Sequence, residues 1–197
     1  AIATYLGMAA LLWRALRRRP MRQGGLGAAN RVTLARGVLV ALLAGTLADP
    51  ALLASHTEWL FGVALVALAL DGVDGWVARR SGSASAVGAR FDMELDAFFI
   101  LVLCLALLLL ERVGPWVLAI GVMRYAFVAA SWHWPWFAGE LPDSLRRKAV
   151  CVWQVAALML ALLPATPGLI ATWLAATALA GLTLSFAVDV RWLYRHR

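Results

Sequence analysis

The chain has 197 residues, of which 63% are hydrophobic and only 15% charged, and its formal net charge is +7. A water-soluble domain carries roughly a quarter of its residues as charged side chains, so this composition excludes an ordinary soluble domain, and it equally excludes a disordered or collagen-like chain. Two cysteines are too few for a disulfide-rich secreted scaffold. The mean hydropathy of +0.79 and the excess of ten tryptophans over three tyrosines predict an all-α integral membrane protein.

Residues 1–30 are predicted to lie at the membrane surface. Residues 1–13 are apolar but too short to cross about 30 Å of hydrocarbon comfortably, and arginines and glycines follow them. We therefore expect an N-terminal interfacial helix and a basic, glycine-rich linker, with a partial seventh span as the alternative. The rest of the chain, residues 31–197, is expected to form one transmembrane domain.

Six transmembrane helices are predicted in that domain, because six windows have the apolar length of a span. Short turns rich in proline and glycine separate several of them, so consecutive helices should pack antiparallel. The windows cover residues 33–54, 57–79, 90–111, 114–134, 147–164 and 167–190.

Basic residues lie almost entirely on one set of the predicted loops. These are the N-terminal segment, the loops near residues 80 and 147, and the C-terminal end, whereas the opposite loops carry Arg112 as their one basic residue. Positively charged loops stay on the cytoplasmic side of a membrane. We expect an inner-membrane protein of a bacterium with both termini and the active site on the cytoplasmic side.

Carboxylates gather where two of the predicted helices approach this cytoplasmic side. Asp71 and Asp74 are spaced i, i+3 near the end of the second predicted helix, and Asp92 and Asp96 are spaced i, i+4 at the start of the third. Each pair therefore shares one helix face, and two antiparallel neighbours can aim all four at one point. Glu94 lies between the last two and is expected to point elsewhere.

Four carboxylates inside a membrane repel one another and need compensation. Pairing with Arg79 and Arg90 would give a structural salt-bridge network, but a pocket of oxygen ligands fits one or two hard divalent cations better, which favours Mg²⁺ or Mn²⁺. Two other functions remain open, a divalent-cation channel or transporter and a structural membrane subunit. The outer halves of the helices are almost wholly apolar, which disfavours a permeation path.

The carboxylates belong to a longer pattern, DxxDGxxAR followed after eight residues by GxxxDxxxD, which resembles the signature of the class I CDP-alcohol phosphotransferase (phosphatidyltransferase) family. The fixed positions are Asp71, Asp74, Gly75, Ala78, Arg79, Gly88, Asp92 and Asp96. Upstream, Asn30, Thr33 and Arg36 resemble a weaker pattern at the entry to the first helix of such proteins. The resemblance implies a metal-dependent membrane enzyme of phospholipid biosynthesis.

The resemblance also implies a role for each matched residue. Two divalent ions, Mg²⁺ or Mn²⁺, would be bound by Asp71, Asp74, Asp92 and Asp96, and Asp96 would also be the catalytic general base. The CDP-linked donor, such as CDP-diacylglycerol, would contact Asn30, Thr33, Asp71, Gly75, Ala78, Arg79 and Gly88. The reaction would transfer the lipid phosphate group to an alcohol and release CMP.

The acceptor alcohol must be recognised by residues outside this signature. Arg124 lies within the fourth predicted helix, where a guanidinium is costly, and Arg146, Arg147 and Lys148 open the fifth. Such a set of cations favours a phosphorylated acceptor, glycerol phosphate or inositol phosphate, over serine or choline. We expect the partners to be the donor lipid, a small alcohol and membrane lipids, with no nucleic acid, and homodimerisation stays open.

Overall fold

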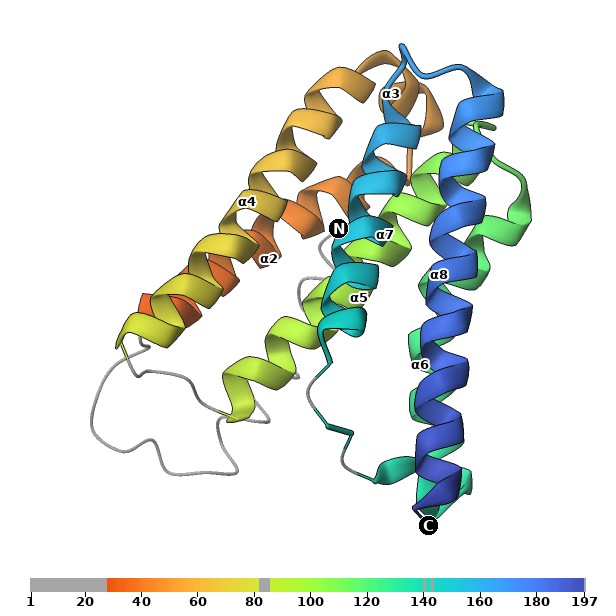
Figure 1. Cartoon of the computed structure of the whole chain (residues 1–197). Coiled ribbons are helices and arrows are strands. Elements are labelled where there is room, and N and C mark those ends of the chain that lie inside the picture. Colours follow the sequence, from red (N-terminus) through yellow and green to blue (C-terminus); the bar gives the residue numbers. More distant parts are fainter. Residues whose placement is uncertain (1–27, 82–85, 140, 143, 197) are drawn as a thin grey trace. The chain divides into compact units, whose positions relative to one another are not determined.

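The computed structural model describes residues 28–81, 86–139, 141–142 and 144–196, and every regular element in these ranges is a helix. Figure 1 shows their order along the chain. The helices are α2 (Ala28–Thr46), α3 (Pro50–Ser55), α4 (Thr57–Ser81), α5 (Ala86–Leu109), α6 (Leu118–His133), α7 (Leu145–Leu162) and α8 (Gly168–Arg195), with short 3-10 turns η1 (Pro115–Val117) and η2 (Pro135–Ala138). This confirms the predicted all-α class. The predicted N-terminal interfacial helix lies outside the described residues.

The first predicted helix, expected as one span over 33–54, is in fact divided. Helix α2 ends at Thr46, and a new short helix, α3, begins at Pro50. The Asp49 carboxylate accepts hydrogen bonds from the backbone N–H groups of Ala51 and Leu52 at 3.0 and 3.1 Å. A capping aspartate followed by proline at the first helical position is a strong start signal, so it separates the two helices at this point.

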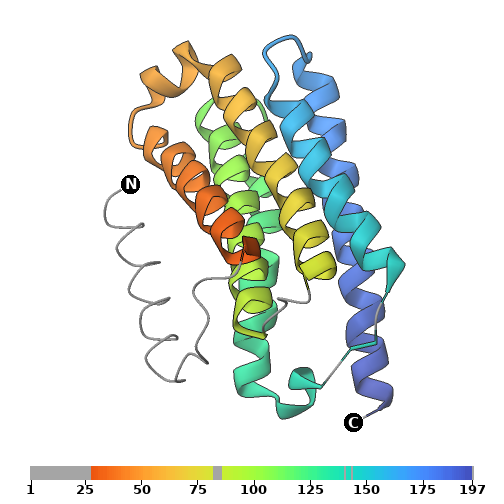
Figure 2. The ribbon, with the colours of Figure 1, turned by 90° about the vertical axis from the view of Figure 1, so that its left-hand side faces the viewer.

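The chain forms two compact units, residues 1–99 and 100–197. In the first unit α2 packs against α4, and the two ribbons run side by side in both Figure 1 and Figure 2. Ala64 and Ala67 of α4 are fully buried, as is Val40 of α2. Small residues at such positions let helix backbones approach closely, which brings the C-terminal half of α4 within reach of side chains on α2.

In the second unit α7 and α8 form an antiparallel pair joined by a short turn (Figure 1). Alanines fill the contact side of both helices and are completely buried. They are Ala157 and Ala161 on α7 and Ala171, Ala175 and Ala178 on α8, at spacings of three and four residues. Small side chains let the two helices pack closely, and their antiparallel direction agrees with the expectation that consecutive helices pack antiparallel.

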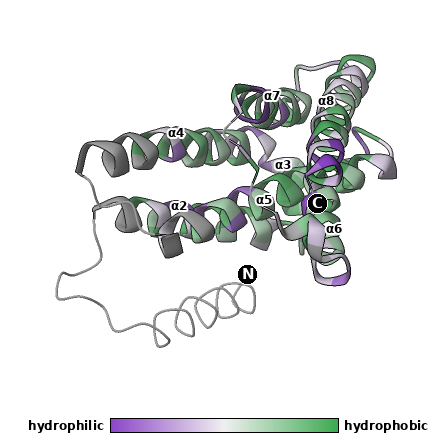
Figure 3. Cartoon of the chain, turned by 60° about the horizontal axis from the view of Figure 1, so that its bottom comes forward, coloured by the Kyte–Doolittle hydropathy of each residue, from purple (hydrophilic) through white to green (hydrophobic). Residues whose placement is uncertain are grey.

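Large apolar side chains point outward on the same helices, among them Leu160, Leu169 and Trp173, and Figure 3 shows hydrophobic residues along most of the described helices. Within the described residues two helical stretches are long and apolar enough to cross a membrane, Pro115–His133 and Gly168–Arg195. Six spans are therefore not established by length and composition. Helices α4 and α5 place carboxylates inside their apolar stretches, which lowers the hydropathy that marks a span.

Close packing of α6 against the second half of α5 depends on Gly121. A Cβ atom there would lie 2.8 Å from Leu101 Cδ1 and 2.9 Å from Leu101 Cα. We expect Gly121→Ala to lower the free energy of unfolding by about 1–3 kcal/mol, because the Leu101 backbone cannot move aside cheaply. In Gly181→Ala, the matched control on α8, the new methyl meets only Val150 at 4.0 Å. Thermal unfolding in detergent compares them, and equal stability of both variants would contradict this assignment.

Candidate metal centre

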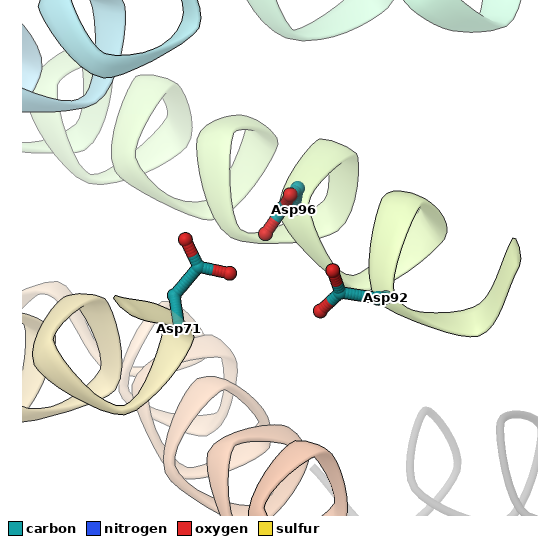
Figure 4. A group of neighbouring side chains, drawn as sticks. All are labelled: Asp71, Asp92 and Asp96. Atoms are coloured by element: carbon teal, nitrogen blue, oxygen red, sulfur yellow. The ribbon is translucent and has the colours of Figure 1, made fainter. Parts of the chain in front are cut away.

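Three carboxylates from two helices converge in the first unit. Asp71 comes from α4, and Asp92 and Asp96 come from successive turns of α5. One oxygen atom of each lies within 4.8 Å of the corresponding oxygens of the other two. Figure 4 shows Asp71 facing the two aspartates of α5 across the space between the helices. The i, i+4 spacing places Asp92 and Asp96 on one helix face, as the sequence predicts.

A fourth residue, Arg36 of α2, joins this cluster. Its Nη1 atom donates a hydrogen bond to Asp71 Oδ1 and forms an ion pair with Asp92 Oδ1 at 2.9 Å. Its Nη2 atom donates to Asp96 Oδ1 at 2.5 Å. One guanidinium thus contacts three carboxylates, and these contacts link α2 to α4 and to α5. In the sequence, Arg36 belongs to the weaker upstream pattern, and the predicted pairing candidates are Arg79 and Arg90. The side chains of Arg79 and Arg90 lie outside the described residues.

The arginine and the carboxylates differ sharply in exposure. The Arg36 side chain is 2% exposed, whereas those of Asp71, Asp92 and Asp96 are 39%, 36% and 35% exposed. A buried guanidinium is costly unless charged partners surround it, and three carboxylates provide that compensation. In turn the guanidinium reduces repulsion among the three carboxylates. Three negative charges against one positive charge still leave the group with a net charge of −2.

This arrangement suits a hard divalent cation. The donor atoms are all carboxylate oxygens, which Mg²⁺ and Mn²⁺ prefer, and they already lie close enough to share one ion after a small contraction. The net negative charge of these four residues attracts a divalent cation. The carboxylate side chains are also 35% to 39% exposed, so the protein itself does not seal them off from an ion.

The structure describes some of the other residues predicted for this site and leaves the rest undescribed. Thr33 is buried on α2, three residues before Arg36, so the two share a helix face. Gly88 lies in the first turn of α5, and Glu94 is exposed and stays outside the carboxylate group, as expected. The side chains of Asn30, Asp74, Ala78 and Arg79, and the surroundings of Gly75, lie outside the described part of the chain.

The residues predicted to bind the acceptor all belong to the second unit. Arg146 Nη1 donates to the Ser185 carbonyl oxygen at 2.5 Å, and its Nη2 donates to Asp189 Oδ1 at 2.5 Å. Arg146 therefore links α7 to α8. Arg147 donates to the Pro142 carbonyl, and its Nη1 lies 4.0 Å from Asp189 Oδ2. Lys148 is exposed, and Arg124 lies half-buried in the middle of α6.

A comparison with protein families decides among the functions left open by the sequence. The family model of CDP-alcohol phosphatidyltransferase matches residues 26–185. The chain belongs to this family. The matched range contains Arg36, the three converging aspartates and all four predicted acceptor residues. No curated protein and no solved structure matches the chain.

Membership of the CDP-alcohol phosphatidyltransferase family makes the chain a transferase of phospholipid biosynthesis, a reaction class in which a phosphatidyl group leaves a CDP-alcohol. The family is integral to membranes and generally uses a divalent metal. This supports the transferase over the channel or transporter considered from the sequence. The three aspartates that the structure brings together are positions of the sequence signature, so the fold places these three signature residues in one site.

Proposed function

We propose that this protein transfers the substituted phosphate group of a CDP-linked lipid, such as CDP-diacylglycerol, to a small alcohol and releases CMP. The observation that carries the proposal is the convergence of Asp71, Asp92 and Asp96 within 4.8 Å in a chain of the CDP-alcohol phosphatidyltransferase family. Asp74, three residues after Asp71 on α4, completes the proposed set of ligands. Together they would hold two divalent ions, Mg²⁺ or Mn²⁺.

When bound, the metal ions would neutralise charge on the donor diphosphate and on the departing phosphate of CMP. Asp96 removes the proton of the acceptor hydroxyl as general base. The acceptor oxygen then forms a bond to the lipid phosphorus, and the bond from that phosphorus to the CMP oxygen breaks with its electron pair leaving on CMP. Asn30, Thr33, Asp71, Gly75, Ala78, Arg79 and Gly88 orient the CDP group.

The acceptor is proposed to carry a phosphate, as glycerol phosphate and inositol phosphate do. Arg124, Arg147 and Lys148 supply the cations that bind it, and Arg146, which is held by Ser185 and Asp189, keeps α7 in place against α8. Charged hydrogen bonds from guanidinium forks to phosphate oxygens are strong and geometrically specific.

Removing one of these cations should weaken acceptor binding more than chemistry. We expect Arg124→Ala and Arg147→Ala each to raise the Michaelis constant for the phosphorylated acceptor about tenfold or more, because a hydrogen bond between charged groups contributes about 1.5–3 kcal/mol. Arg191→Ala, which removes an exposed arginine of α8, is the control and should leave the constant unchanged. Release of CMP only with unphosphorylated alcohols would refute the proposed acceptor class.

The active site is proposed to face the cytoplasm, because loops rich in basic residues are expected to stay on that side of a membrane. The two ends of α8 provide a test, since a helix of 28 residues is about 42 Å long. In a background with Cys104 and Cys151 replaced by serine, a cysteine in place of exposed Ala165 should react with a membrane-impermeant reagent added to intact cells. A cysteine in place of exposed His196 should react only after permeabilisation. The opposite labelling pattern would reverse the proposed orientation.

A further inference from the structure

Arg36 is the least exposed residue of the carboxylate cluster and contacts all three of its aspartates. The residue is 1% exposed, although α2 is otherwise apolar from Val32 to Thr46. A guanidinium buried in such a helix is maintained only where its contacts repay the cost of removing it from water. Its contacts are with three of the four proposed metal ligands, so its position is coupled to theirs.

Each terminal nitrogen of the guanidinium contacts different carboxylates. Nη1 lies between Asp71 and Asp92, which come from two different helices, and Nη2 binds Asp96, one turn further along α5. The two nitrogens belong to one rigid planar group, so they set the spacing of the carboxylates they hold. A Lys ammonium is a single charged centre on a flexible stem and cannot reproduce that spacing.

The contacts also give each carboxylate an inner side and an outer side. All three use the Oδ1 atom, and Asp92 Oδ1 is itself buried. The same side chains are nevertheless 35% to 39% exposed, so each also has surface that the buried guanidinium does not cover. A carboxylate has lone pairs for about four contacts, so it can accept from a guanidinium beneath it and bind a cation from the open side at once.

We propose that Arg36 is a positioning residue for the metal centre. It holds Asp71, Asp92 and Asp96 from the buried side, fixes their orientation before a metal arrives, and stays bound to them when the ion enters from the exposed side. This inference rests on the proposed function, because it requires that these carboxylates bind a divalent ion. Groups that orient metal ligands by hydrogen bonds commonly contribute tenfold to a hundredfold to metal affinity.

The test measures Mn²⁺ affinity in the purified full-length protein without substrates, from the loss of the electron paramagnetic resonance signal of free Mn²⁺. Arg36→Met and Arg36→Lys should each weaken binding about 10- to 100-fold. Lys keeps the charge but not the fork, so both variants are expected to be impaired. Arg191→Met removes an exposed positive charge from α8 and should bind Mn²⁺ as tightly as the wild type.

Each alternative gives a different result. Tighter Mn²⁺ binding in Arg36→Met would mean that the guanidinium competes with the metal, and wild-type affinity in Arg36→Lys would mean that charge alone suffices; either would overturn the positioning role. Wild-type affinity in both variants would also overturn it while leaving the proposed function intact. If the wild-type protein itself binds no Mn²⁺, it is the proposed metal centre that fails.

A measurement on the wild type covers the case in which the variants do not fold. In protein labelled with ¹⁵N arginine, the side-chain N–H signals of Arg36 should remain hydrogen-bonded and slow to exchange when Mg²⁺ is added to saturation. Their conversion to the signals of a solvated, mobile guanidinium would show that the metal displaces Arg36, and the proposal would be wrong.

Discussion

Asp92→Asn is expected to lower the rate of CMP release at least about a thousandfold, and Asp71→Asn by a similar factor. The substitution keeps the shape of the side chain but removes a charged ligand from a group whose oxygens lie within 4.8 Å of one another. Metal ions contribute several kcal/mol of transition-state charge stabilisation in such reactions, and about 4 kcal/mol corresponds to a thousandfold loss of rate. Both variants should also need higher metal concentrations for any remaining activity.

The structure offers a matched control for these variants. Glu94 lies on α5 between Asp92 and Asp96, but it is exposed and does not belong to the converging group. Glu94→Gln removes one negative charge from the same helix turn but no proposed metal ligand. This variant should therefore retain nearly full activity. Unchanged turnover in both aspartate variants, or an equal loss in Glu94→Gln, would contradict the assignment of the metal ligands.

Asp96→Asn should abolish transfer while leaving binding of the CDP-linked donor largely intact. A positioned general base contributes about a hundredfold to ten-thousandfold to a rate, and an amide cannot accept the proton of the acceptor hydroxyl. The hydrogen bond from Arg36 Nη2 to Oδ1 can be kept by the amide oxygen, so the local fold should survive. Steady-state kinetics gives the turnover number, and calorimetry with the donor gives the affinity.

The opposite result would show that Asp96 is not the general base. Loss of donor binding together with normal turnover of the fraction that does bind would leave Asp96 as a metal ligand alone and not the base. The position of Asp96 within the same oxygen cluster as Asp71 and Asp92 makes this distinction necessary, because proximity alone fits both roles.

The carboxylate cluster could be predicted from the sequence because its geometry is mostly local. Asp92 and Asp96 are one helical turn apart, and an antiparallel arrangement of consecutive helices brings Asp71 near them, so helix periodicity and chain reversal suffice. The same reasoning predicts close packing of the last two helices. Charged residues within apolar windows marked this region as functional, and the structure places three of them together.

The role of Arg36 could not be predicted in this way. It is separated from Asp71 by 35 residues and from Asp96 by 60, and no periodicity connects positions that far apart on three helices. The available signal was a single guanidinium within an otherwise apolar stretch, which indicates a buried partner without identifying it. Asp49 with Pro50 is recognised in the sequence as a helix-breaking signal, but the first predicted span extends across it to residue 54 because apolar residues continue on both sides.

The most direct test of the proposed function is CMP release by the purified protein in detergent, with CDP-diacylglycerol and a panel of alcohols that includes glycerol phosphate, inositol phosphate, serine and choline. We predict that CMP appears with Mg²⁺ or Mn²⁺ and one phosphorylated alcohol, stops when a chelator is added and returns when the metal is restored. CMP release that continues in excess chelator, or no release with any alcohol from a folded protein that binds Mn²⁺, would contradict the proposed metal-dependent transfer.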